Sequence, residues 1–279
     1  MTKDTILNYT LHLADNALIL AQRNSEWCGH GPVLEQDIAI TNISLDLIGQ
    51  ARSLYQYAAM LMNKTIPSPS AAGGGQEEAS LPPGAIERGA SEDTLAYLRD
   101  VREFRNCLLV EQPNGDWAQT ILRQFFFSTY QLFLYKQLQQ STDAALAAIA
   151  EKSLKEVTYH VRWSSEWVIR LGDGTQESHD RLLTALDELW MYTGELFIPA
   201  GYELEAAKAG VGVDVSALKA GWLQRVNEVF EEATIGDALT GTENTWMQQG
   251  GKDGVHSEHL GYMLAEMQYM QRVYPGCEW

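Results

Sequence analysis

The chain has 279 residues, of which 45% are hydrophobic and 20% charged, enough for one large helical domain. Its formal net charge of −17 produces a field that repels nucleic acid and anionic membrane surfaces, so we expect neither as a partner. The three cysteines, Cys28, Cys107 and Cys277, form no Cys-x-x-Cys pair and indicate neither a disulfide framework nor a zinc ribbon.

The first twenty residues are typical of an amphipathic helix and not of a signal peptide, because Lys3, Asp4, His12 and Asp15 interrupt the apolar residues. The sequence also has no run of 18 apolar residues, the minimum for a transmembrane helix. We therefore expect a cytoplasmic protein.

Helical spacing of apolar residues predicts a first helix over about 4–27, which the sequence Gly-His-Gly-Pro at 29–32 ends. A second helix over about 33–62 is apolar on nearly two faces, as expected of a central bundle helix. Residues 63–91 are rich in proline, glycine and serine, and we expect a mobile surface insertion there.

The second half of the chain predicts further helices. Ser91 can cap a helix that runs through Leu108, and Asp143 can cap the helix that ends near 172–174. The intervening helix, 116–140, contains the aromatic run 125–127, which favours core packing over a substrate pocket. Three more helical patterns cover 178–196, 214–233 and 256–273. No segment alternates with period two, so the sequence predicts an all-α fold, a single domain over 1–279 built on a four-helix bundle with additional C-terminal helices.

The helix that carries His160 is where a metal would be sought. Carboxylate-bridged di-iron bundles place a Glu on each of two helices and a Glu-x-x-His on each of the other two. Here the residue three before His160 is Val157, and Glu156 is rotated by about 100° around the helix. Glu156 should therefore not bind the same ion as His160.

The other helices also lack expected ligands. The first helix offers Glu26, and the second offers Asp46, followed at i+3 by Gly49 where a histidine is required. The helix over 117–142 contains no aspartate or glutamate. We expect no stoichiometric iron in this bundle, and we interpret Glu26, Asp46 and His160 as a buried hydrogen-bonded cluster.

Three further patterns have two readings each. His256 and His259 could hold zinc with Glu258, although capping and hydrogen bonding are favoured. The stretch 250–254 (GGKDG) fails as a phosphate loop, because aspartate follows the lysine and no strand precedes it, and a flexible connection is the better account. Arginines spaced by three could meet an acidic partner or coenzyme phosphates, but pairing with acidic residues of the same helix is favoured. These are Arg99, Arg102 and Arg105, with Glu92, Asp93, Asp100 and Glu103 as the acidic residues.

Several stretches together resemble the structural-subunit family of bacterial phenylacetyl-CoA epoxidases, which are multicomponent ring-epoxidising monooxygenases. The matching stretches are EWCGH at 26–30, LDLIGQAR at 45–52, LLVEQPNG at 108–115, KE at 155–156 with YH at 159–160, H at 256 with EHLG at 258–261, and LAEMQY at 264–269. They span nearly the whole chain. The 63–91 insertion departs from the short connection of the family.

The resemblance implies a ferritin-like fold and a non-catalytic sister of the iron-binding subunit. It also implies a degenerate ligand set, in which two positions are filled, one is shortened and three have lost their ligand. These vestigial positions are Glu26 and His160 (filled), Asp46 (for a glutamate), Gly49 (for a histidine), Ser128 (for the third helix's carboxylate) and Val157 (for the last glutamate).

The resemblance further implies that this chain pairs with the catalytic di-iron subunit and helps to dock the small and reductase subunits, within a heterotetramer that could contain a homodimer of this chain. Iron would belong to the partner, with electrons from NADPH through a flavin and iron-sulfur reductase, and this chain would hold no cofactor. Two alternatives stay open: a divergent oxidase with a single metal at Glu26, Asp46 and His160, and a ferritin-like storage protein.

Overall fold

The computed structural model describes residues 2–64, 89–240 and 246–277. Across these ranges the chain is helical and has no strand, which confirms the all-α prediction. The α-helices are α1 (Lys3–Ser25), α2 (Leu34–Asn63), α3 (Glu92–Tyr97), α4 (Leu108–Glu111), α5 (Trp117–Leu138), α6 (Ala144–Gly172), α7 (Gln176–Leu189), α8 (Gly201–Lys208), α9 (Lys219–Glu232), α10 (Glu258–Met267) and α11 (Tyr269–Val273). No described helix combines the length and the apolar character that a membrane crossing requires.

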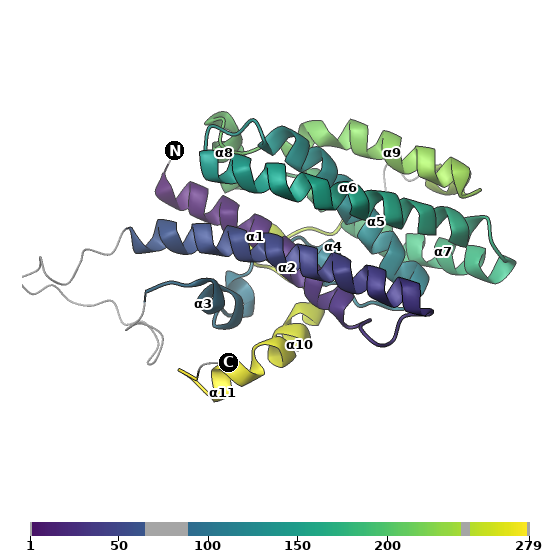
Figure 1. Cartoon of the computed structure of the whole chain (residues 1–279). Coiled ribbons are helices and arrows are strands. Elements are labelled where there is room, and N and C mark those ends of the chain that lie inside the picture. Colours follow the sequence, from purple (N-terminus) through teal and green to yellow (C-terminus); the bar gives the residue numbers. More distant parts are fainter. Residues whose placement is uncertain (1, 65–88, 241–245, 278–279) are drawn as a thin grey trace, which may run out of the picture.

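The four long helices form the predicted bundle. α1 packs along α2, α5 packs along α6, and α2 packs against α6 to join the two pairs. Short connections link the helices of each pair, as in antiparallel hairpins. Figure 1 shows α9 on one side of this bundle and α10 with α11 on the opposite side.

Polar side chains begin the bundle helices where the sequence indicated. The Asp143 carboxylate accepts hydrogen bonds from the backbone N–H groups of Ala145 (3.0 Å) and Leu146 (3.1 Å) at the start of α6. The Asp116 carboxylate accepts from the N–H of Gln119 at the start of α5 (3.0 Å). These bonds satisfy N–H groups that have no partner inside a helix.

The helix that Ser91 begins is much shorter than predicted. It ends at Tyr97, and a short 3-10 helix (Val101–Glu103) and extended backbone follow before α4. This irregular course lets backbone N–H groups reach α1, because those of Arg105 and Cys107 donate to Asp15 and Asn16 (both 2.8 Å). Tertiary hydrogen bonds therefore override the local helical pattern.

Two later helical predictions need smaller corrections. The pattern over 178–196 becomes α7, which ends at Leu189, followed by the 3-10 helices Trp190–Tyr192 and Gly194–Phe197. The pattern over 256–273 is interrupted at Gln268 between α10 and α11. Helix α8 was not predicted.

Most of the predicted 63–91 insertion, residues 65–88, lies outside the described part of the chain. Its two flanks are joined directly. The Asn63 side-chain amide donates to the carbonyl of Ala90 and its oxygen accepts from the Ala90 N–H, both at 2.8 Å. The two described flanks of this segment therefore lie side by side.

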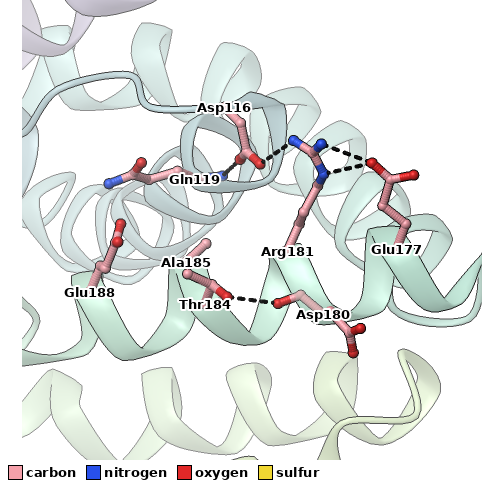
Figure 2. A pocket seen from close by; sticks show the side chains of 8 residues that line it. All are labelled: Asp116, Gln119, Glu177, Asp180, Arg181, Thr184, Ala185 and Glu188. Carbon is pink, nitrogen blue, oxygen red and sulfur yellow. Dashed lines mark hydrogen bonds and ion pairs between the residues drawn. The ribbon is translucent and has the colours of Figure 1, made fainter.

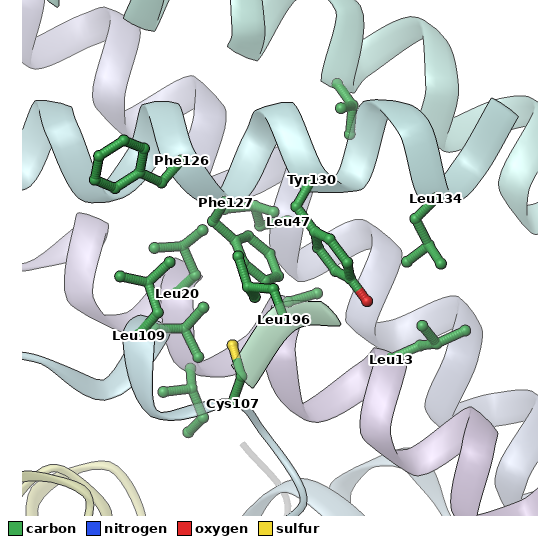
Figure 3. Close-up of a cluster of buried hydrophobic side chains, with 14 of the residues drawn as sticks. Leu13, Leu20, Leu47, Cys107, Leu109, Phe126, Phe127, Tyr130, Leu134 and Leu196 are labelled. Carbon is green, nitrogen blue, oxygen red and sulfur yellow. The ribbon is translucent and has the colours of Figure 1, made fainter. Parts of the chain in front are cut away.

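The aromatic run of α5 lies in the core, as predicted. Phe125, Phe126, Phe127 and Tyr130 are all almost fully buried. In Figure 3, Phe127 and Tyr130 lie among leucines from α1, α2 and α4. The aromatic run therefore packs α5 against α1, α2 and the short helix α4.

Helices α6, α7 and α9 meet at Gly172, the last residue of α6. A Cβ atom there would lie 2.1 Å from the backbone carbonyl oxygen of Ala233, just after α9. The Gly172 carbonyl also contacts His179 Nδ1 of α7 (2.8 Å) and accepts from the Thr234 hydroxyl (3.3 Å). Only glycine permits this close approach.

We predict that Gly172→Ala lowers the free energy of unfolding by about 1–3 kcal/mol, because the added methyl group displaces backbone. Urea denaturation measures it. Gly49→Ala is the matched control, since a Cβ at that helical position meets no heavy atom within 4 Å. It should raise stability by up to about 1 kcal/mol. Equal effects of the two substitutions would contradict the close-approach argument.

Candidate functional site

Asp46 and His160 are the two predicted ligand positions that the structure brings together. His160 Nε2 of α6 lies 3.0 Å from Asp46 Oδ2 of α2. The imidazole is fully buried, whereas 36% of the Asp46 side chain is exposed. Among the described residues, no hydrogen-bond partner contacts His160 Nδ1. The two side chains can share a proton in their hydrogen bond, but together they offer a metal ion only two ligand groups.

One helical turn further along the same seam, Glu156 contacts a different residue of α2. Its Oε2 accepts a hydrogen bond from Gln50 Nε2 (3.0 Å), and Gln50 Oε1 accepts from the Tyr135 hydroxyl (3.2 Å). Glu156 is thus engaged apart from the Asp46–His160 pair. Beside it, Gly49 leaves a hollow of about 180 Å³ between α2 and α6.

Two further vestigial positions, Ser128 and Val157, contain neither a carboxylate nor an imidazole. Val157 is fully buried among apolar side chains of the core. The Ser128 hydroxyl of α5 lies 3.3 Å from the Ser164 hydroxyl of α6. A small neutral pair therefore stands where the resemblance places the carboxylate of the third helix.

Glu26 does not join Asp46 and His160, so the interpretation of these three residues as one buried cluster is wrong. Glu26 follows the end of α1, and 38% of its side chain is exposed. Its Oε1 accepts from Arg23 (2.9 Å) and its Oε2 from Asn114 (2.8 Å). Both oxygens are engaged at the end of the bundle.

The side chains of the bundle that could bind a metal do not fit a di-iron centre. Such a centre needs bridging carboxylates from several helices together with two histidines. Over residues 2–64, 89–240 and 246–277, no three His, Cys, Asp or Glu side chains converge closely enough to hold a metal ion. Within the described parts of the four long helices, Asp46 and His160 supply one carboxylate and one imidazole in contact.

A second polar region surrounds α1, and sequence reasoning did not identify it. We call it the buried ionic layer. It connects α1 to segments far along the chain, and its charged members are almost fully buried. They are Asp15, Arg99, Glu111, Glu195, Glu203, Lys252 and His256.

Asp15 of α1 is the most heavily bonded carboxylate of this layer. Its oxygens contact the Arg99 guanidinium and accept from the Tyr55 hydroxyl (2.5 Å) and from the backbone N–H of Arg105 (2.8 Å). The prediction that Arg99, Arg102 and Arg105 pair along their own helix is therefore wrong. Arg99 is buried against α1, and Arg102 is exposed in the 3-10 helix Val101–Glu103.

The stretch 250–254 is also part of the buried ionic layer and not a flexible connection. Lys252 is buried, and its ammonium donates to Glu203 (2.9 Å) and to the carbonyl of Ile198 (3.1 Å). Glu195 accepts from the backbone N–H groups of Gly250 (2.8 Å) and Leu108 (2.6 Å). Burial raises the pKa of Glu195.

His256 closes the layer at the segment that leads into α10. Its Nδ1 lies 2.8 Å from Glu111 Oε2, and its Nε2 lies 2.9 Å from the carbonyl oxygen of Phe104. Both partners are acceptors, so the geometry favours a doubly protonated ring. The predicted hydrogen-bonding role of His256 is confirmed. Neither nitrogen is left for a zinc ion shared with His259.

Glu111 also caps α10. Its Oε1 accepts from the backbone N–H of Ser257 (2.6 Å), and its Oε2 accepts from Asn106 (2.8 Å). The only sequence signal for the layer is a charge inside an apolar pattern, such as Asp15 between Ala14 and Ala17. That signal does not name the partner.

The outer side of α2 carries exposed apolar residues, and we call it the α2 apolar face. Its members are Leu34 (72% exposed), Ile38 (51%), Leu45 (60%) and Ile48 (42%). Steps of four, seven and three residues place all four on one side of a helix. Exposed aliphatic side chains gathered on one side of a helix are typical of interaction sites.

A hollow of about 650 Å³ lies between the start of α5 and α7 and is predominantly acidic (Figure 2). Arg181 crosses it and pairs with Asp116 (3.1 Å) and Glu177 (2.8 Å). These are exposed surface pairs. The hollow gathers no buried group of the kind that catalysis uses.

Comparisons with known proteins agree with this architecture. A family model described as phenylacetic acid catabolic protein matches residues 1–279. The chain is also 45% identical over 271 residues to one of the subunits of the 1,2-phenylacetyl-CoA epoxidase of Escherichia coli (strain K12). That match covers 97% of this chain and 98% of the relative.

We predict that Asp15→Asn lowers the free energy of unfolding by about 3–5 kcal/mol, because it leaves the buried Arg99 charge without its counter-ion. Chemical denaturation measures it. The matched control is Asp100→Asn, whose carboxylate pairs with Arg272 on the surface (3.0 Å). A loss as large in the control as in Asp15→Asn would refute the argument.

A second prediction concerns pH. Burial opposes protonation of His256, but the hydrogen bond and charge of Glu111, the Phe104 carbonyl and Asp15 raise its pKa above the ordinary value. The resulting stabilisation should be complete below about pH 6.5 and should be lost as the pH rises through the higher folded pKa.

The measurement is urea denaturation from about pH 6 to pH 9, comparing the natural chain with His256→Gln. The stability difference between them should shrink as the pH rises. A difference that is independent of pH would mean that folding does not change the pKa of His256 and would contradict the argument.

Proposed function

The chain belongs to the phenylacetic acid catabolic protein family, and from this membership we propose that it is the non-catalytic structural subunit of a multicomponent phenylacetyl-CoA epoxidase. The relative from Escherichia coli is named as a subunit of 1,2-phenylacetyl-CoA epoxidase, and the match runs along nearly the whole of both chains. An enzyme whose chains are named as subunits is a complex of several chains.

The non-catalytic role is supported by the small number of metal-ligand side chains in the bundle. The four helices bring one carboxylate, Asp46, to one imidazole, His160, and the vestigial positions Gly49, Ser128 and Val157 contribute none. Two irons would lack the bridging carboxylates that hold and tune them. The iron, oxygen and acyl-CoA chemistry then belongs to the catalytic partner.

Pairing with that partner is supported by the α2 apolar face. A helix of a monomeric protein rarely exposes four large aliphatic side chains on one side, and covering them with another protein removes them from water. We further propose that the small and reductase subunits dock on the assembled pair, which receives electrons from NADPH through the reductase.

The alternative is an oxidase with a single metal ion at Glu26, Asp46 and His160. Asp46 and His160 lie together, but Glu26 is bonded to Arg23 and Asn114. We therefore rank it second. Bound iron or manganese, with activity lost in His160→Ala while the complex still assembles, would favour it.

The proposal predicts that this chain raises the recovery of the catalytic subunit in soluble, iron-loaded form. The two should be co-expressed with ample iron, one of them affinity-tagged, and compared with each chain expressed alone. We expect co-elution of both chains, and iron that follows the catalytic subunit. A tagged natural chain that recovers no catalytic subunit would refute the pairing.

Metal analysis of this chain purified alone is the second readout. Iron well below one per chain agrees with the proposal, and about two per chain contradicts it. If the chain binds the partner and also carries two irons, the result would support the pairing and refute the non-catalytic role.

A further inference from the structure

We propose that the α2 apolar face and the hollow at Gly49 together form the seat of one helix of the catalytic subunit, and that a lysine or arginine of that helix enters the hollow and pairs with Glu156. This inference rests on the proposed function and adds the surface, the element that occupies it and the charge of the contacting residue.

The spacing on α2 fits a helix as the occupant. Leu34, Ile38, Leu45 and Ile48 follow the alternation of three and four residues that lines the contact between two long helices, with Thr41 at the one skipped step. A long partner helix laid along α2 would cover all four aliphatic side chains at once. A short loop could not.

The hollow provides a socket within this face. Gly49 follows Ile48 on α2, and a Cβ at Gly49 would meet no heavy atom within 4 Å. The opposite wall comes from α6, with Ile149, Lys152 and Glu156. About 180 Å³ is enough for a single long side chain, and its aliphatic part would contact Ile149.

The fixed charge of the socket is negative. Glu156 is half-buried and held by Gln50, whereas Lys152 is exposed and free to turn outward. Within the described residues, only Oε2 of Glu156 has a hydrogen-bond partner, which leaves Oε1 for a donor from outside. Asp46, which precedes Gly49 by about one turn of α2, adds a second partly exposed carboxylate. A basic side chain complements this arrangement.

The same charges disfavour a second copy of this chain as the occupant. Two copies in contact through this face would bring Asp46 and Glu156 of each near their counterparts. Each copy also has a net charge of −17. Like charges across an interface oppose association, so the face suits a different chain.

Gly49→Leu is the sharpest test, because it separates folding from binding. The folded chain has room for the side chain, and leucine favours helix over glycine, so thermal stability should be equal or higher. The filled socket should nevertheless weaken binding of the catalytic subunit by at least about tenfold. Ile48→Asp should weaken it similarly, and Glu156→Gln should weaken it and reduce its dependence on salt.

The matched controls are Tyr262→Asp and Leu204→Asp, which place a charge on exposed apolar residues outside the face. They should bind as the natural chain does. Binding would be measured by titration of the iron-loaded catalytic subunit at two salt concentrations, with thermal unfolding of each variant alongside.

If the natural chain binds and Gly49→Leu and Ile48→Asp bind equally well, this seat is wrong and the proposed function stands. If the natural chain does not bind at all, the proposed function itself fails. Self-association of this chain alone that Ile48→Asp abolishes would identify a second copy as the occupant and overturn the proposal.

Discussion

The fold depends on the burial of the central part of α1, residues 9–21. From Tyr9 to Ala21 every residue of this helix is buried, so His12, Asp15 and Asn16 lie where water cannot satisfy them. A buried polar group without a partner destabilises the folded state, and a buried charge does so more strongly. The partners come from two parts of the chain. Residues 99–111 supply Arg99 and the backbone N–H groups of Arg105 and Cys107. Helix α8 supplies Glu203, which lies 3.5 Å from His12 Nε2 and pairs with Lys252. Buried polar contacts therefore fix these segments on α1.

Charged groups are distributed unequally between the α2–α6 seam and the surroundings of α1. The seam between α2 and α6 contains one carboxylate–imidazole pair, Asp46 with His160, and a separate carboxylate, Glu156, bonded to Gln50. Helix α5 faces α6 there with a serine. The buried ionic layer, by contrast, contains four carboxylates, each bonded to a cation or to backbone N–H groups. Several stretches that carry the family resemblance meet there, since Glu111 from one contacts His256 from another. Their shared role in this chain is to fix the covering segments on α1.

The sequence was sufficient to predict the four bundle helices. It was insufficient to predict how the segments around α1 pack on them. Helical periodicity and capping residues such as Asp116 and Asp143 are local properties, and the structure places the four long helices within a few residues of the predicted bounds. The vestigial positions on α2 and α6 also followed from spacing within one helix. Pairs such as Asp15 with Arg99 depend on contacts across 84 residues, which no local pattern encodes. The same long-range bonds explain why the helix after Ser91 is short, why 250–254 is rigidly bonded, and why Glu26 lies apart from Asp46.

The pairing of α1 with distant segments has a consequence for synthesis. Ribosomes release the chain from its beginning, at about 5–20 residues per second, so the bundle helices up to Gly172 emerge before Lys252 and His256 exist. During that interval the first helix can dock on the second and Asp15 can pair with Arg99, but Glu111 still lacks His256. Glu203, once made, likewise waits for Lys252. The last quarter of translation therefore completes the buried ionic layer.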